Sequence, residues 1–143
     1  MLYGLEAGKY RLALKTPKDQ IINVEYTRDK SKKKAAYKKS KAINLKSDID
    51  SIYTSTEKAA RWYKVSVSST KKRKAVTLSK DSVGGGFKFR VYQKGKRLKT
   101  VRVTKNDKVK TVKLPKKKGT YYVKVTKLTS KTTGAYYLGT YTY

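Results

Sequence analysis

Apolar residues alternate with Lys, Arg, Ser and Thr along most of this chain, and that period of two constrains the fold more than any other feature. In "RWYKVSVS" Tyr63 and Val65 alternate with polar residues, and "GFKFRVY" places Phe87 and Phe89 in the same way. Because successive side chains of a β-strand point to opposite faces, each stretch has one core face and one wet, cationic face. No stretch of about a dozen residues shows the period of a capped helix.

Short polar connections separate further strands of the same kind. These strands are "KAVTLS" with Val76 and Leu78, "KTVRVT" with Val101 and Val103, "KVKTVKL" with Val112 and Leu114, and "TYYVKVT" with Tyr121, Val123 and Val125. We expect hairpin turns at residues 93–96, 105–107 and 116–119. Regular strands with short turns predict an all-β sandwich or barrel, closed mainly by antiparallel hairpins.

A near-copy of the closing segment, which we expect to be a β-hairpin, opens the chain. "GKYRLAL" at 8–14 parallels "GTYYVKV" at 119–125, and each stretch leads through a polar turn to a strand that ends in Tyr-Thr. We interpret residues 1–27 as an extra N-terminal β-hairpin, the tail of a preceding repeat, in which residues 8–14 and 21–27 pair. The alternative is that any two hairpins in a Lys- and Tyr-rich chain look alike. An isolated hairpin is marginally stable, so it would pack in cis, pair with another molecule or stay free.

The stretch "RDKSKKKAAYKKSK", residues 28–41, breaks the alternation and is dense in positive charge. Repulsion among its lysines favours a solvated, extended Lys-rich linker, and a ligand-gripping arm is the alternative. The main β-sandwich is then expected over residues 42–143.

The net charge of +29 comes from 38 Lys and Arg against nine Asp and Glu. Such a charge attracts polyanions. Only seven of the 38 cations are Arg. Because Arg supplies the planar fork for bidentate readout and Lys acts as a hydrated point charge, this bias favours diffuse attraction over specific recognition.

Several chemistries are excluded or weakened by the residue types present. The chain has no Cys and no His, which excludes disulfides, thiolate metal sites and nucleophilic catalysis by a Ser–His or Cys–His pair. "GGGF" at 84–87 lacks the Gly-Lys-Ser/Thr end of a phosphate loop, so a flexible strand connection is the better interpretation. We therefore expect no enzymatic activity and no cofactor.

Membrane and export signals are also missing from the sequence. No apolar run approaches the roughly 18 residues of a membrane span. "MLYGLEAGKY" lacks the features of a signal peptide, so export would imply a longer precursor.

From Ala42 onward the order of features resembles the bacterial pre-peptidase C-terminal (PPC) domain family. The matching stretches are the lead-in "KAINLKSDIDSIY", the aromatic strand "ARWYKVSVSS", the middle strand "FKFRVYQKGKRL" and the closing segment "LPKKKGTYYVKVTKLTSKTTGAYYLGTYT". The resemblance implies a secreted antiparallel β-sandwich of jelly-roll type, here with roughly 8–9 strands.

The chain also departs from that family. Arg61 stands where related modules have an acidic residue before the aromatic strand. The calcium-binding acids of the similar collagen-binding modules of clostridial collagenases are reduced to Asp48, Asp50 and Glu57. Calcium needs six or more oxygen ligands, so we expect no metal site here.

Strand parity also predicts which aromatic and basic side chains face solvent. The candidate ligand-binding residues are Trp62, Lys64, Tyr92, Tyr122, Lys124, Tyr137 and Tyr141. Exposed rings beside cations can stack on sugar rings or bases while Lys neutralises an anion. The alternative is that these rings only cover their cross-strand neighbours.

Three functions remain open at this point. The first is a non-catalytic accessory or adhesion module of a secreted or cell-surface protein from a Gram-positive bacterium, extracellular or wall-associated. It would bind anionic cell-wall polymers or acidic glycans and adjoin other domains of a longer precursor. The second is a nucleic-acid-binding β-domain, which a pI near 10.2 permits. The third is a structural spacer.

Overall fold

The fold was analysed in a computed structural model of the chain. The structure describes residues 35–45, 52–54, 60–81, 85–132 and 135–143, together with 9, 11, 13, 15, 18, 19 and 21–24. The elements of this part are one short 3₁₀ helix and nine strands: η1 (Lys39–Lys41), β1 (Ile43–Asn44), β2 (Ile52–Thr54), β3 (Arg61–Val67), β4 (Lys74–Asp81), β5 (Phe87–Gln93), β6 (Lys96–Val103), β7 (Val109–Lys113), β8 (Gly119–Lys127) and β9 (Ala135–Thr142).

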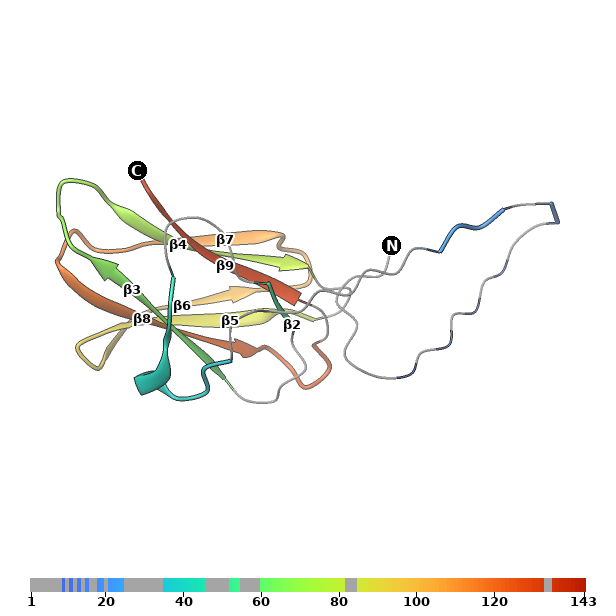
Figure 1. The fold of residues 1–143 in the computed structure, drawn as a ribbon, viewed down its shortest axis with the longest axis horizontal. Helices are drawn as coiled ribbons and strands as arrows, with labels where there is room; N and C mark the ends of the chain where they lie inside the picture. Colours follow the sequence, from blue (N-terminus) through green and yellow to red (C-terminus); the bar gives the residue numbers. More distant parts are fainter. Residues whose placement is uncertain are drawn as a thin grey trace.

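The strands form two sheets that pack face to face as a β-sandwich (Figure 1). One sheet has the order β1-β3-β8-β5-β6, and the other has the order β2-β9-β4-β7. All pairs are antiparallel except β1 with β3. The eight strands from β2 to β9 therefore follow the jelly-roll order, with β1 added beside β3. The predicted all-β fold is confirmed.

The core lies between the sheets and contains the residues that strand parity placed inside. Along β3 the side chains alternate between buried and partly or fully exposed, and β5 and β8 show the same alternation. The largest fully buried side chains are Tyr63, Tyr121, Phe87, Phe89, Leu78 and Leu138. Hydrophobic burial on this face, at roughly 25 cal/mol per Å² of apolar area, is what holds the two layers together.

Of the three predicted hairpin turns, only the first is one. Residues 93–96 join β5 to β6 within one sheet, and Lys94 and Gly95 both have positive φ, as a two-residue type I′ turn requires. The connections at 105–107 and 116–119 instead cross from one sheet to the other. β7 belongs to the four-stranded sheet, whereas β6 and β8, which precede and follow it in the sequence, belong to the five-stranded sheet. The expectation of hairpins there was wrong, since polar turn residues suit both kinds of connection.

The closing segment is not a hairpin either. Its strands β8 and β9 lie in different sheets, where β8 pairs with β3 and β5 while β9 pairs with β2 and β4. In the N-terminal stretch the residues that the structure describes carry no strand, and Lys18 and Asp19 form a turn. Half of the residues in the predicted pairing of 8–14 with 21–27 lie outside the described residues, so that pairing stays a prediction.

The end of the predicted linker packs against the five-stranded sheet. Ala36 is only 4% exposed, and its carbonyl oxygen accepts a hydrogen bond of 2.8 Å from the backbone N–H of Trp62. Residues 28–34 lie outside the described residues. This hydrogen bond brings the chain just before η1 to β3, and Lys39 of η1 reaches the Tyr122 ring on the outer face of the sheet.

Tyr121 anchors the start of β8. Its buried ring carries a hydroxyl that donates a hydrogen bond of 2.9 Å to the carbonyl oxygen of Lys117, four residues upstream. Burial raises the pKa of this phenol above its ordinary value of 10.0. The folded state therefore holds the proton more tightly than the unfolded state, so this contribution to stability is complete below pH 10.0 and is lost as the pH rises through the folded pKa.

We expect Tyr121→Phe to lower the free energy of unfolding by about 1 kcal/mol at neutral pH, because the hydrogen bond to Lys117 is lost. The same change is expected to make the loss of stability at alkaline pH shallower than in the unmodified protein. Urea unfolding measured across the alkaline range checks both effects. An alkaline slope equal to that of the unmodified protein would show that the Tyr121 phenol does not contribute. At neutral pH the control Tyr122→Phe, on the outer face of β8, should unfold like the unmodified protein.

Candidate functional site

Five of the seven candidate residues come together on the outer face of the five-stranded sheet. In the register of β3 and β8, Trp62 lies opposite Lys124 and Lys64 lies opposite Tyr122. In the register of β5 and β8, Tyr92 lies opposite Tyr122. All five side chains are half-buried, so each has one side against the sheet and one toward solvent.

The rings on this face contact one another and nearby ammonium groups. The centroids of Trp62 and Tyr92 are 5.6 Å apart with a tilt of 41°, although their strands are separated by β8. The Lys124 Nζ lies 5.3 Å from the centroid of the Trp62 ring. The Lys39 Nζ, which comes from η1, lies 4.6 Å from the centroid of the Tyr122 ring. Each cation–π contact at such an accessible site contributes about 0.5–1 kcal/mol.

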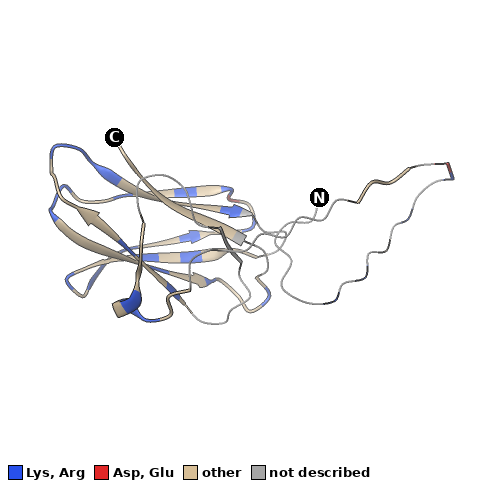
Figure 2. Cartoon of the chain, viewed as in Figure 1, with Lys and Arg blue, Asp and Glu red and all other residues tan. Residues whose placement is uncertain are grey.

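Positive charges lie directly opposite one another on this face. Arg90 of β5 is the register partner of Lys124 of β8, and Lys88 of β5 is the partner of Arg102 of β6. Like charges at directly opposite positions destabilise a sheet. Figure 2 shows Lys and Arg along the strands and turns of both sheets.

The described acids do not offset this charge. Among the residues that the structure describes, the acids are Asp19, Asp81 and Asp107. Asp81 ends β4 in the other sheet. Asp107 lies between β6 and β7, where Lys110, at 2.7 Å, and Thr104 hydrogen-bond its carboxylate and hold its pKa well below the usual range. The outer positions of β3, β8 and β5 therefore carry cations, rings and hydroxyls without a carboxylate.

We call this surface the aromatic–cationic face. Its members are Lys39, Trp62, Lys64, Arg90, Tyr92, Tyr122 and Lys124. Sequence reasoning missed two of them. Arg90 shares the parity of Tyr92 and could have been found from that signal, whereas Lys39 reaches the face only because the chain before η1 packs on β3.

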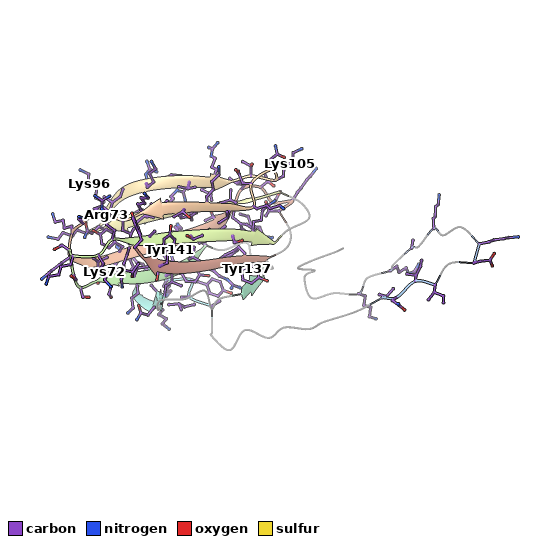
Figure 3. All side chains as sticks on the ribbon, turned by 90° about the horizontal axis from the view of Figure 1, so that it is seen from above. Lys72, Arg73, Lys96, Lys105, Tyr137 and Tyr141 are labelled. Carbon is purple, nitrogen blue, oxygen red and sulfur yellow. The ribbon has the colours of Figure 1, made fainter. Side chains whose placement is uncertain are left out.

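The other two candidate residues lie on a different surface. Tyr137 and Tyr141 belong to β9 in the four-stranded sheet, and both have the outward parity (Figure 3). Tyr141 is 44% exposed, and its ring centroid lies 5.8 Å from that of Tyr143. The Lys113 Nζ lies 5.1 Å from the centroid of the Tyr143 ring. The fold therefore divides the predicted site between its two outer faces.

The described residues offer rings and cations for binding. In the described part of the chain, no group of three His, Cys, Asp or Glu side chains is placed to hold a metal ion. Asp48, Asp50 and Glu57 lie outside the described residues, so the expectation that they bind no calcium stays a prediction. The expected absence of catalysis and of a cofactor also stays a prediction. Over the described ranges, no helix is both long and apolar enough to cross a membrane.

Comparison of the sequence with models of protein families finds no match, and comparison with curated proteins finds none either. The jelly-roll sandwich is the fold that the resemblance to the PPC family implied. One fold serves many functions, so membership of that family stays a hypothesis and the function has to be argued from the surface.

Proposed function

We propose that this β-sandwich is a non-catalytic module that binds a flexible anionic carbohydrate polymer. The observation that carries the proposal is the aromatic–cationic face, where rings and ammonium or guanidinium groups adjoin on three neighbouring strands. The polymer would be an anionic cell-wall polymer or an acidic glycan, which share repeated negative charges and sugar rings.

The charge pattern supports a polyanionic ligand. The opposed pairs Arg90–Lys124 and Lys88–Arg102 repel one another in the free protein. A bound polyanion would relieve that repulsion and release its own counterions, which makes binding favourable at low salt. A flexible chain suits this surface because the cations are spread over several strands and are mostly lysines, which act as point charges.

The aromatic rings support a ligand with sugar rings. The Trp62 and Tyr92 rings adjoin at a centroid distance of 5.6 Å, and the face of such a ring can pack on the C–H groups of a pyranose. In the free protein the Lys124 ammonium lies over the Trp62 ring, and this cation–π contact contributes about 1 kcal/mol or less. An anionic group of the ligand can attract the ammonium more strongly and so expose the ring.

In its cellular setting, the domain would be an accessory or adhesion module of a secreted or cell-surface protein, extracellular or wall-associated, in a Gram-positive bacterium. The resemblance to the PPC family and the Lys-, Thr- and Tyr-rich composition support this setting. The module would adjoin other domains of a longer precursor. A domain that only separates its neighbours would bind no polymer, and the same experiment distinguishes this spacer role.

One observation favours nucleic acid as a second candidate. Arg90, Arg97 and Arg102, three of the seven arginines, lie on the neighbouring strands β5 and β6, and the register places all three on the outer face. Arginines beside stacked rings also suit single-stranded nucleic acid. The polymer proposal remains the better supported one because the outward-facing cations of β3 and β8 and the cations of η1 are lysines.

Binding of four probes tests the proposal. They are a glycosylated polyol-phosphate wall polymer, a uronate-rich glycan, inorganic polyphosphate and a single-stranded oligonucleotide, each titrated at rising salt. We expect a carbohydrate polymer to bind more tightly than polyphosphate, and the carbohydrate polymer with the higher affinity identifies the source. Equal binding of polyphosphate would remove the role assigned to the rings. Tighter binding of the oligonucleotide at physiological salt would favour the second candidate, and no binding would favour a spacer.

Two variants separate the contribution of charge from that of the rings. The affinity of the unmodified protein should fall as the salt concentration rises from about 50 to about 200 mM. In the variant with Lys64→Gln and Lys124→Gln this fall should be about tenfold smaller, because two fewer counterions are released. Tyr92→Ala should weaken binding about tenfold without changing the salt dependence, since one stacking contact is lost. The control Lys105→Gln with Lys108→Gln removes the same charge from exposed positions between β6 and β7 and should leave binding nearly unchanged. Equal effects of the two double variants would overturn the assignment to this face.

A further inference from the structure

The outer face of the four-stranded sheet carries a second cluster of rings and cations. Its members are Arg73, Lys113, Tyr141 and Tyr143, which we call the C-terminal face. Arg73 and Tyr143 form a pair of backbone hydrogen bonds of 3.0 and 2.9 Å, which extends the β4–β9 ladder by one residue on each strand. Arg73 thereby takes the outward parity of Ala75, whose register partners are Tyr141 and Lys113. All four residues thus lie on one side of the sheet, as Figure 3 shows for Arg73 and Tyr141.

The side chains of this face are held in place before any ligand binds. Ala75 has the outward parity but is 0% exposed, and its register partners on the two neighbouring strands are Tyr141 and Lys113. The Tyr143 ring centroid lies 5.8 Å from that of Tyr141 and 5.1 Å from the Lys113 Nζ. Tyr141 and Tyr143 are still 44% and 45% exposed. Such preorganised yet accessible rings lower the entropy that binding costs.

The surroundings favour an anion with hydroxyl groups. The hydroxyls of Thr77 and Thr111, the next outward pair on β4 and β7, lie 2.9 Å apart and extend the cluster along the sheet with polar groups. The acid among the described residues of β4 is Asp81. It lies six residues from Ala75, about 20 Å along the strand, so it is too far to neutralise Arg73 or Lys113.

We propose that the C-terminal face is a second binding site for the same anionic carbohydrate polymer, so that one molecule bridges two polymer chains. This inference rests on the proposed function of the aromatic–cationic face. The two faces are the outer surfaces of opposite sheets, so they point away from each other. The sheets are separated by about 10 Å, and a layer of side chains lies outside each of them. A short oligomer therefore contacts one face only, and a long polymer links separate molecules.

The test compares short and long forms of whichever carbohydrate polymer binds. With an oligomer shorter than the thickness of the sandwich, calorimetry should give two oligomers per protein molecule. With the full-length polymer, light scattering should rise steeply at intermediate protein concentration and fall again when protein is in excess. Sedimentation of the protein with the short oligomer should show a single protein molecule, because otherwise the scattering would come from association of the protein itself.

Variants assign each site. Tyr141→Ser combined with Lys113→Gln should lower the stoichiometry from two to one and abolish the rise in scattering, while the remaining site keeps its affinity. Lys64→Gln combined with Lys124→Gln should weaken the other site instead. If both the unmodified protein and the variant with Tyr141→Ser and Lys113→Gln bind one oligomer per molecule, the second site is overturned and the proposed function is left intact. No binding of either form would overturn both.

Discussion

Gly86→Ala is expected to lower the free energy of unfolding by about 3 kcal/mol, the upper end of the usual cost of overpacking. A Cβ at this position would lie far inside van der Waals contact with the carbonyl oxygen of Val103, and 3.0 Å from both the Cα of Thr104 and the Cδ1 of Leu128. The first two are backbone atoms at the end of β6, so they cannot move aside as a flexible side chain could. The melting temperature should fall by about 10 °C.

Hydrogen bonds hold the backbone of Gly86 through both its N–H group and its carbonyl oxygen. Its N–H donates a hydrogen bond of 3.2 Å to the Thr132 hydroxyl, and its carbonyl oxygen accepts one of 2.9 Å from the N–H of Leu128. Thr132 is itself fully buried. Relief of the clash would therefore break hydrogen bonds that fix the start of β5 against the connection after β8.

Gly95→Ala is the matched control. Gly95 has φ +77 in the β5–β6 turn, but nothing lies within 4 Å of an added Cβ. The cost there is only the left-handed backbone, about 1 kcal/mol. Thermal and urea unfolding of the two variants measure the difference. A Gly86→Ala variant no less stable than Gly95→Ala would show that the chain relaxes at Gly86 and that its close packing is not essential.

From the sequence, the run of glycines in "GGGF" before a strand predicts a flexible connection, because glycine permits many conformations. In the structure Gly86 is needed for the opposite reason, since another backbone passes too close for any side chain. A single sequence cannot distinguish the two roles, because the neighbour that requires glycine, Val103, is set by tertiary packing.

Strand parity predicted much of the fold and of the site. The inward residues of β3, β5 and β8 are those that the period of two placed inside, and Trp62, Lys64, Tyr92, Tyr122 and Lys124 share one outer face as their parity and strand pairing require. The pattern works because it follows from the backbone geometry of a strand and needs no knowledge of the partner strand.

Parity could not predict which sheet a strand joins. If β8 and β9 formed one hairpin, Tyr137 and Tyr141 would lie on the same outer face as Tyr122. The connection between them instead crosses the sandwich, so these tyrosines lie on the opposite face. Short polar turns serve both hairpins and crossings between sheets, and the choice depends on long-range pairing such as that of β9 with β4.

Tyr136→Ala is expected to lower the free energy of unfolding by about 4 kcal/mol, because it removes a large buried ring from between the sheets. The Tyr136 ring, on β9, packs edge-on against Phe87 of β5 at a centroid distance of 4.9 Å. Its hydroxyl lies 2.8 Å from the hydroxyl of Tyr63 on β3, within the core. Tyr136 thereby joins two strands of the five-stranded sheet to the central region of the other sheet.

Two further variants divide that loss between ring and hydroxyl. Tyr136→Phe keeps the ring and should cost about 1–2 kcal/mol, the range for a buried hydrogen bond. If the two hydroxyls act as a pair, Tyr136→Phe and Tyr63→Phe together should cost clearly less than the sum of the single changes. Tyr141→Ala, the same substitution on the outer side of β9, should cost less than about 1 kcal/mol. Urea unfolding measures the free energy of unfolding of each variant. If Tyr136→Phe lowers it as much as Tyr136→Ala does, the hydroxyl pair alone, and not the ring, accounts for the stabilising contact between the sheets.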